Sequence, residues 1–258
     1  MTDALNADHI TKVFGGLTAV DDVSLHVGEK ELVALIGPNG AGKTTFFNCL
    51  TGVGPATTGT VKIGGQEVKK NTKAYKVAQM GISRTFQNIR LFSQLSVLEN
   101  VLIALTNHYK ENFLTAVLRL PTYYKTEEAM EERAKELLKD FDLEDVMYFP
   151  AGSLPYGTQR RVEIVRALAT EPKIICLDEP AAGMNPEETA DLTRLIKRLQ
   201  TEYGIAVLLI EHDMSLVMNL AERIYVLAEG KLLAKGTPSE IQNDEAVIKA
   251  YLGGGADV

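Results

Sequence analysis

Residues 37–45 read GPNGAGKTT, and this stretch decides the fold. It fits the spacing G-x-x-x-x-G-K-[ST], with Gly42, Lys43 and Thr44 at the fixed positions. The apolar run ELVALI precedes it, and TFFNCL follows with the composition of a helix. An ordinary glycine-rich turn with a surface lysine would not need this full spacing between a strand and a helix. The stretch therefore predicts a loop whose backbone N–H groups wrap phosphate groups at the start of a helix.

Each part of this loop has an expected role. Lys43 supplies a positive charge for the β- and γ-phosphates, and Thr44 supplies a hydroxyl group for Mg²⁺. We expect a nucleoside triphosphate and Mg²⁺ as cofactors. The loop residues predicted to contact the nucleotide are Gly37, Pro38, Asn39, Gly40, Ala41, Gly42, Lys43, Thr44 and Thr45.

Two later segments place polar side chains directly after apolar runs. KIICLDEP puts Asp178 and Glu179 at the end of one predicted strand, and IAVLLIEHD puts His212 just beyond another. Ligands of open α/β sheets collect at this end of parallel strands. Asp178 is expected to anchor Mg²⁺, and Glu179 is expected to polarise an attacking water. Taken alone, Asp-Glu-Pro could simply end a strand, and a lone histidine is usually structural.

Composition limits the class of protein. The chain has 258 residues, 45% of them hydrophobic, and a formal net charge of −7, which argues against broad electrostatic binding to nucleic acid. Its apolar runs are shorter than the roughly 20 residues that a membrane-spanning helix needs, and its polar start is unlike a secretory signal. Cys49 and Cys176 lie in apolar contexts and are expected to be buried free thiols.

The pattern of hydrophobic residues changes twice along the chain. Residues 8–36 and the stretch TVKIGGQEV read as strands, the latter with a hairpin turn at Gly64-Gly65. Segments 96–105 and 126–141 have helical spacing, whereas 110–125 reads as an irregular insertion. From residue 173 onward, strands alternate with helices, which indicates parallel βαβ units, and a final hairpin follows at YVLAEGKLLAKG.

Five segments in order carry a family resemblance. GPNGAGKTT, ISRTFQNIRLF, LPYGTQRRVEIVRAL, KIICLDEP and LLIEHD together resemble the ATP-binding subunit of an ABC transporter over essentially the whole chain. TFFNCLTG, RTFQNIRLF, AAGMNP, LIEHDMSLVM and IKAYLG are similar, more narrowly, to the larger ATP-binding subunit of LIV-type branched-chain amino-acid importers. Close relatives of that group handle other hydrophobic amino acids, amides or urea.

The resemblance implies a fold class and a division of the chain. The expected fold is α/β, with a P-loop (RecA-like) core, an N-terminal antiparallel β subdomain and an inserted α-helical subdomain. Residues 1–90 and 166–258 would form the nucleotide-binding core. Residues 91–165 would form the helical subdomain with the signature segment, all within a single ATPase domain.

The resemblance also implies roles for individual residues. Phe14 would stack on adenine, with Val20 as a candidate flanking residue, although an edge-strand core aromatic is as reasonable an interpretation of Phe14 alone. Gln87 would contact Mg²⁺ and water. Glu179 would be the general base, and His212 would contact the γ-phosphate. Asn185 would lie in a loop facing a partner ATPase.

The same resemblance implies partners and a location. A second ATP-binding subunit, identical or paralogous, would pack head to tail with this one. Transmembrane permease subunits would dock on it, and a periplasmic or extracellular solute-binding protein would act indirectly. The chain would then lie peripherally on the cytoplasmic face of the plasma membrane. Ile89, Leu91 and Phe92 are candidates for the docking surface, or alternatively belong to the core of the helical subdomain.

The signature segment departs from the family phrase LSGGQ. Leu154 and Gly157 match, whereas Pro155, Tyr156 and Thr158 do not. Proline offers neither the hydroxyl group of the family's serine nor a backbone N–H. Tyr156, Gly157 and Thr158 are still expected to contact the nucleotide of the partner subunit, in a site weaker than the one built on Lys43.

Three other classes of protein share part of this motif set. A small-molecule kinase would share the phosphate loop but not LPYG or EHD. A soluble ABC protein of DNA repair or translation usually carries coiled coils or two ATPase units. The ATPase of lipopolysaccharide export is the nearest alternative, and the segment 110–125 with the terminal AYLG favours the importer.

Overall fold

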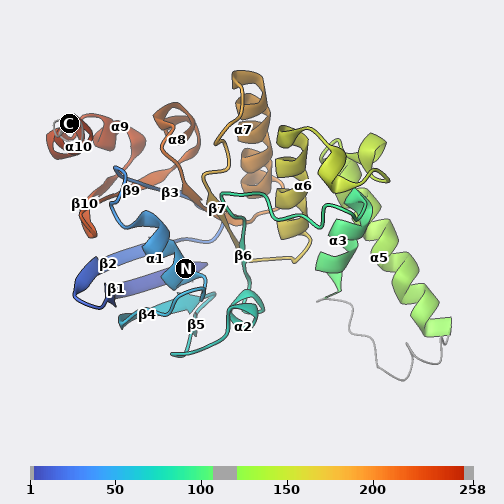
Figure 1. Cartoon of the computed structure of the whole chain (residues 1–258), viewed down its shortest axis with the longest axis horizontal. Coiled ribbons are helices and arrows are strands. Elements are labelled where there is room, and N and C mark those ends of the chain that lie inside the picture. Colours follow the sequence, from blue (N-terminus) through green and yellow to red (C-terminus); the bar gives the residue numbers. More distant parts are fainter. Residues whose placement is uncertain (1–2, 107–120, 253–258) are drawn as a thin grey trace. The chain divides into compact units, whose positions relative to one another are not determined.

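The computed structural model of the protein describes residues 3–106 and 121–252. The chain forms two compact units: Met1–Gln87 with Lys173–Val258, called here the core unit, and Asn88–Pro172, called the inserted unit. The two segments of the core unit are far apart in the sequence but build one set of sheets (Figure 1).

A six-stranded sheet forms the centre of the core unit. Its strand order is β10-β9-β3-β8-β7-β6, and all neighbours are parallel except β9 and β10. The strands are β3 (Leu32–Ile36), β6 (Ile82–Arg84), β7 (Ile174–Asp178), β8 (Ala206–Ile210), β9 (Arg223–Ala228) and β10 (Lys231–Gly236). Every residue of β3, β7 and β8 is buried, as expected for parallel strands covered on both faces. The predicted βαβ units and the final hairpin are confirmed.

Helices of the core unit lie on both sides of this sheet. They are α1 (Lys43–Leu50), α2 (Ala74–Ala78), α7 (Pro186–Thr201), α8 (Met214–Leu220), α9 (Pro238–Gln242) and α10 (Glu245–Leu252). Figure 1 shows α1 between the central sheet and a second sheet, with α7 and α8 on the opposite side of the central sheet. Helix α7 starts at Pro186 because Asn185 supplies an N-cap and Pro186 a first-turn proline.

The second sheet of the core unit is antiparallel and has the order β2-β1-β4-β5. Its strands are β1 (Leu5–Phe14), β2 (Leu17–Val27), β4 (Thr58–Ile63) and β5 (Gln66–Glu67). Strand β1 begins earlier than the sequence pattern suggested because its pairing with β2 shifts register around His9, which has a positive φ of 52°. Such a bulge interrupts the alternation on which strand prediction depends. Buried side chains of both sheets and α1 form one hydrophobic core.

The inserted unit is helical in its described part. It contains α3 (Val97–Leu105), α5 (Pro121–Asp140), the 3₁₀ turns η1 (Glu144–Val146) and η2 (Ala151–Ser153), and α6 (Tyr156–Leu168). The face predicted for α5 is buried: Met130, Ala134, Leu137, Leu138 and Phe141. The interpretation of 110–125 as irregular is wrong for 121–125, which belong to α5, and residues 110–120 lie outside the described residues.

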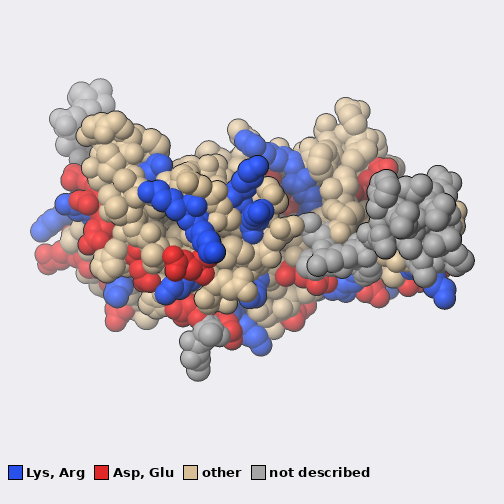
Figure 2. All heavy atoms as spheres, turned by 90° about the horizontal axis from the view of Figure 1, so that it is seen from below, with Lys and Arg blue, Asp and Glu red and all other residues tan. Residues whose placement is uncertain are grey.

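Three further properties concern the chain as described. Cys49 and Cys176 are free and buried, as predicted. Among residues 3–106 and 121–252, no helix has the length and apolar character needed to cross a membrane. Acidic and basic side chains both occur across the face drawn in Figure 2, which agrees with the moderate net charge of −7.

Candidate nucleotide-binding site

The phosphate loop connects β3 to α1, and its glycines are required by close backbone contacts. Gly37 has a φ of 151°, and a Cβ atom there would lie 2.1 Å from the carbonyl oxygen of Leu227 in β9. Gly42 has a φ of 95°, and a Cβ atom there would lie 2.5 Å from the carbonyl oxygen of Ala19. Both ends of the loop therefore admit only glycine, because any side chain would displace neighbouring backbone.

Lys43 is buried at the start of α1 and folds back over the loop. Its Nζ donates to the carbonyl oxygens of Gly37 at 2.6 Å and Pro38 at 3.0 Å. Burial lowers the pKa of the Lys43 ammonium, and the carboxylates of Glu179 and Asp178 oppose this shift. A phosphate group would give this ammonium a partner of opposite charge.

The exposed side of the loop presents backbone and hydroxyl groups. Asn39, Gly40 and Thr44 are exposed, whereas Ala41 is buried and Thr45 is partly buried. Helix α1 has no side-chain cap and no acidic residue in its first turn. Its first N–H groups are therefore available to an anion, with the helix dipole favouring negative charge.

The predicted polar side chains meet at one edge of the central sheet. Strands β3, β8 and β7 are parallel neighbours, so the loop after β3 and the residues after β7 and β8 come together. Asp178 is buried at the end of β7. Gln87 Nε2 donates to Glu179 Oε2 at 2.8 Å, and His212 Nδ1 lies 3.9 Å from Glu179 Oε1. The structure thus brings the side chains of Gln87, Glu179 and His212 together.

Sequence reasoning missed Arg84 at this edge. The guanidinium of Arg84, in β6, donates through Nη2 to Asp178 Oδ2 at 2.8 Å, and the two side chains are 9% and 7% exposed. The signal available in the sequence was a cation within ISRTFQ, close before Gln87. Its partner could not be read from that segment because the pairing of β6 with β7 joins distant parts of the chain.

Glu211 is the second residue that sequence reasoning missed. It follows β8 and is 1% exposed. Its Oε1 accepts the Ala181 N–H at 2.8 Å, and its Oε2 accepts the His212 N–H at 3.2 Å. Burial raises the pKa of the Glu211 carboxyl, and these two N–H donors oppose the shift. Glu211 therefore holds the backbone of the loops that carry Glu179 and His212.

Phe14 ends β1 with 54% of its surface exposed, so it is not a core aromatic. The Nζ of Lys12 lies 4.9 Å from its ring centroid. Val20, by contrast, is fully buried. An exposed ring in the core unit has a face on which a planar base can stack.

Comparison with known proteins adds to this geometry. The family model described as ABC transporter matches residues 20–182, more than half of the chain. The chain belongs to the ABC transporter family. A second family model, described as branched-chain amino acid ATP-binding cassette transporter, matches residues 231–257. ABC transporter ATP-binding domains bind nucleotide, and the chain is an ATPase of the class coupled to transport.

Curated relatives of this ABC protein include two named for branched-chain amino acid transport. The ATP-binding protein BraF of Pseudomonas aeruginosa is 47% identical over 96% of this chain and 97% of its own length. The ATP-binding protein LivG of Salmonella typhimurium is 46% identical over 93% of this chain and 94% of its own length. The lipopolysaccharide export ATP-binding protein LptB of Escherichia coli is 38% identical over 96% of this chain and 97% of its own length.

Solved structures agree with the ABC fold. A crystal structure described as the ADP conformation of an ATP-binding cassette of an ABC transporter matches with a TM-score of 0.83 and 32% identity, over 98% of this chain and 100% of that one. A dimeric cassette described as a post-hydrolysis state with ADP and Pi matches with a TM-score of 0.75 and 28% identity, over 91% and 98%. The fold class and the family predicted from the motifs are confirmed.

The segment predicted as the signature lies in the inserted unit, at the start of α6. Pro155 occupies the N-cap position and offers no side-chain cap. Tyr156 is 41% exposed, Gly157 is buried and Thr158 is partly buried. The Tyr156 hydroxyl accepts a hydrogen bond from Arg160 Nη2 at 3.1 Å. The tyrosine that replaces a family glycine is therefore anchored on its own helix.

The structure also places the residues predicted to face a partner ATPase or a permease. Asn185 Oδ1 accepts the Glu188 N–H at 3.0 Å, which caps α7. In the inserted unit, Ile89 and Leu91 are partly buried, whereas Phe92 is 51% exposed with Arg166 over its ring at 5.8 Å. Of the three docking candidates, Phe92 thus presents the largest free apolar surface.

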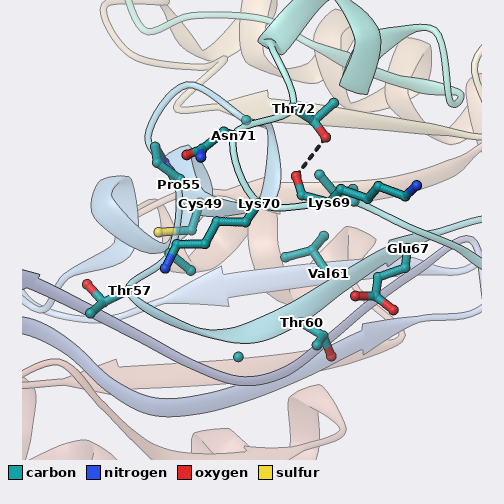
Figure 3. Close-up of a pocket in the computed structure, with 14 residues that line it drawn as sticks. Cys49, Pro55, Thr57, Thr60, Val61, Glu67, Lys69, Lys70, Asn71 and Thr72 are labelled. Carbon is teal, nitrogen blue, oxygen red and sulfur yellow. Dashed lines mark hydrogen bonds between the residues drawn. The ribbon is translucent and has the colours of Figure 1, made fainter.

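A cavity of about 410 Å³ lies elsewhere in the core unit (Figure 3). It is lined from the C-terminal end of α1, β4 and the segment after β5, including Cys49, Val61 and Lys70. Thr72 Oγ1 donates to the Lys69 carbonyl oxygen at 2.6 Å at its rim (Figure 3). None of its lining residues belongs to the phosphate loop, so this cavity is separate from the nucleotide site.

Proposed function

We propose that the chain binds and hydrolyses ATP with Mg²⁺ and so powers an ABC importer of branched-chain or similar hydrophobic amino acids. The observation that carries the substrate class is the match of residues 231–257 to the branched-chain amino acid cassette model. Higher identity to BraF and LivG than to LptB, over similar shares of the chain, supports the importer over lipopolysaccharide export.

The oxygen ligands at the sheet edge fit Mg²⁺. Asp178 offers one carboxylate and Thr44 one hydroxyl, and Mg²⁺ sites of nucleotide enzymes combine such sparse protein ligands with phosphates and waters. The cation would neutralise charge on the phosphates. Gln87 would approach the same position from the segment that follows β6. Lys43 would leave the carbonyl oxygens of Gly37 and Pro38 to bind the β- and γ-phosphates.

Glu179 is the general base in this proposal. Its two carboxylate oxygens face Gln87 and His212, so all three side chains can surround one water at the end of a γ-phosphate. Glu179 would accept the proton of that water, and His212 would contact the γ-phosphate. The hydrogen bonds that the Glu211 carboxylate accepts from the backbone N–H groups of Ala181 and His212 would hold these side chains in place.

Two such ATPases would work as a dimer on the cytoplasmic face of the plasma membrane. We infer that residues 91–165 act as the helical subdomain and that Tyr156, Gly157 and Thr158 meet the nucleotide bound to the opposite subunit. Asn185 would face that subunit. A permease would dock at the segment containing Phe92, and a solute-binding protein would act through the permease. Nucleic acid is not a partner in this proposal.

Replacing Phe14 by Ala should weaken ATP binding. Stacking of a base on an aromatic ring contributes about 1–3 kcal/mol, so the dissociation constant should rise about 5- to 150-fold. Fluorescence titration with a labelled ATP analogue measures this. Phe14→Trp should retain tight binding because it keeps a ring. Equal affinities for the Ala variant and the unchanged chain would exclude Phe14 from the adenine site.

Replacing Pro155 by Ser should raise ATP turnover of a homodimeric preparation. Serine restores a hydroxyl group for the partner's γ-phosphate, and a hydrogen bond to a charged group is worth about 1.5–3 kcal/mol, or about ten- to hundredfold if made in the transition state. Phosphate release under saturating ATP provides the measurement. Pro155→Ala removes the proline without adding a hydroxyl group and should not accelerate turnover. A Ser variant no faster than the Ala variant would contradict the proposed role.

The transport function is tested by co-purification. The tagged chain, extracted with detergent from its native membranes, should bring down two integral membrane subunits and a second ATPase. Reconstituted into vesicles, that complex should hydrolyse ATP faster when its binding protein carries leucine, isoleucine or valine. Recovery of ribosomes, nucleic acid or a lipopolysaccharide-export complex would overturn the proposal.

A further inference from the structure

The guanidinium of Arg84 is held in the core unit through both of its terminal nitrogens and by two aromatic rings. Its Nη1 donates to Asn48 Oδ1 at 2.6 Å and to Thr51 Oγ1 at 3.1 Å, both near the end of α1. The rings of Phe47 and Phe86 lie 4.6 and 4.9 Å from its central carbon atom. A group fixed this firmly gives its remaining contact, to Asp178, a defined direction.

That contact uses only one oxygen of the carboxylate. Arg84 Nη2 binds Asp178 Oδ2 at 2.8 Å. Within the described residues, no hydrogen bond or ion pair involves Asp178 Oδ1. The Asp178 backbone N–H, in turn, reaches Thr85 Oγ1 at 3.4 Å. The carboxylate is thus oriented through one oxygen while the other remains available.

We propose that Arg84 is a positioning residue that orients Asp178 to receive Mg²⁺. Metal-ligating carboxylates are themselves held by hydrogen bonds, and those outer contacts set metal affinity. A purely structural purpose is a weaker explanation, because a buried ion pair adds little net stability over apolar side chains of the same size. The segment 84–87 then holds the carboxylates of both Asp178 and Glu179, because Arg84 binds Asp178 and Gln87 binds Glu179. This inference rests on the proposed ATPase function.

Nucleotide binding with and without metal tests the inference on the full-length chain. A fluorescent ATP analogue is titrated first in EDTA and then at increasing Mg²⁺. In Arg84→Gln, the half-saturating Mg²⁺ concentration should rise about 10- to 100-fold, with affinity in EDTA unchanged. Arg84→Lys should also raise the half-saturating Mg²⁺ concentration, because an ammonium keeps the charge but cannot bond to Asn48, Thr51 and Asp178 at once.

Two controls separate the possible outcomes. Asn48→Ala, which removes one anchor of the guanidinium and leaves the pair intact, should give a smaller rise in the same direction. Arg194→Gln, which removes an exposed arginine paired with Asp191, should change nothing. Unchanged or lower half-saturating Mg²⁺ in Arg84→Gln, or equal weakening in EDTA, would overturn the inference alone. If the chain without any substitution binds no nucleotide, both the inference and the proposed function are overturned.

Discussion

Glu179→Gln should lower ATP turnover about 100- to 10,000-fold, the usual contribution of a general base. Glutamine has the size of glutamate but cannot accept a proton from water. The hydrogen bond between Gln87 and position 179, 2.8 Å in the structure, can persist through the new amide oxygen. Nucleotide affinity should therefore remain close to that of the unchanged chain. Phosphate release and titration with an ATP analogue measure the two quantities separately.

A matched substitution shows whether the effect is specific. Glu187 is an exposed acid in the first turn of α7, and Glu187→Gln should leave turnover unchanged. A Glu179→Gln chain that still turns over ATP at the normal rate would remove Glu179 from the role of base. His212, 3.9 Å from Glu179, would then be the next group to replace.

The phosphate loop was predictable because its determinants are local. Spacing along the chain fixes which residues form a strand, a loop and a helix start, and Gly37 and Gly42 meet backbone that leaves no room for a side chain. Asp178 and His212 were predictable for a related reason. Asp178 is the last residue of one fully buried strand, His212 lies two residues beyond another, and parallel strands end at a shared edge.

Arg84 and Glu211 were not predictable in this way. Strand β6 has only three residues, too few for a hydrophobic period, and its existence depends on pairing with β7. Glu211 was read as part of the strand before His212, and its burial comes from the loop at Ala181 that folds over it. Both residues work through partners that are distant in sequence, which composition and spacing do not encode.

Breaking the ion pair between Arg160 and Glu163 should destabilise the inserted unit strongly. The two side chains are 0% and 2% exposed and lie 2.6 Å apart, and Glu163 Oε1 also accepts the Arg90 N–H at 3.2 Å. Removing one partner of a buried pair leaves an uncompensated charge and costs about 3–5 kcal/mol. Glu163→Leu should therefore lower the free energy of unfolding by about this amount. Urea unfolding of the purified chain measures it.

The double variant Arg160→Met with Glu163→Leu shows whether the stability lost in Glu163→Leu comes from an unpaired buried charge or from a packing defect. Apolar side chains leave no unpaired ion, so most of the lost stability should return. In the exposed i,i+3 pair of α5, Arg133 with Glu136, the change Glu136→Leu should cost about 1 kcal/mol or less. If the double variant is as unstable as Glu163→Leu, the cost lies in packing. If stability returns but turnover does not, the pair is needed to connect the Arg90 segment, just after Gln87, with the helix that begins at Tyr156.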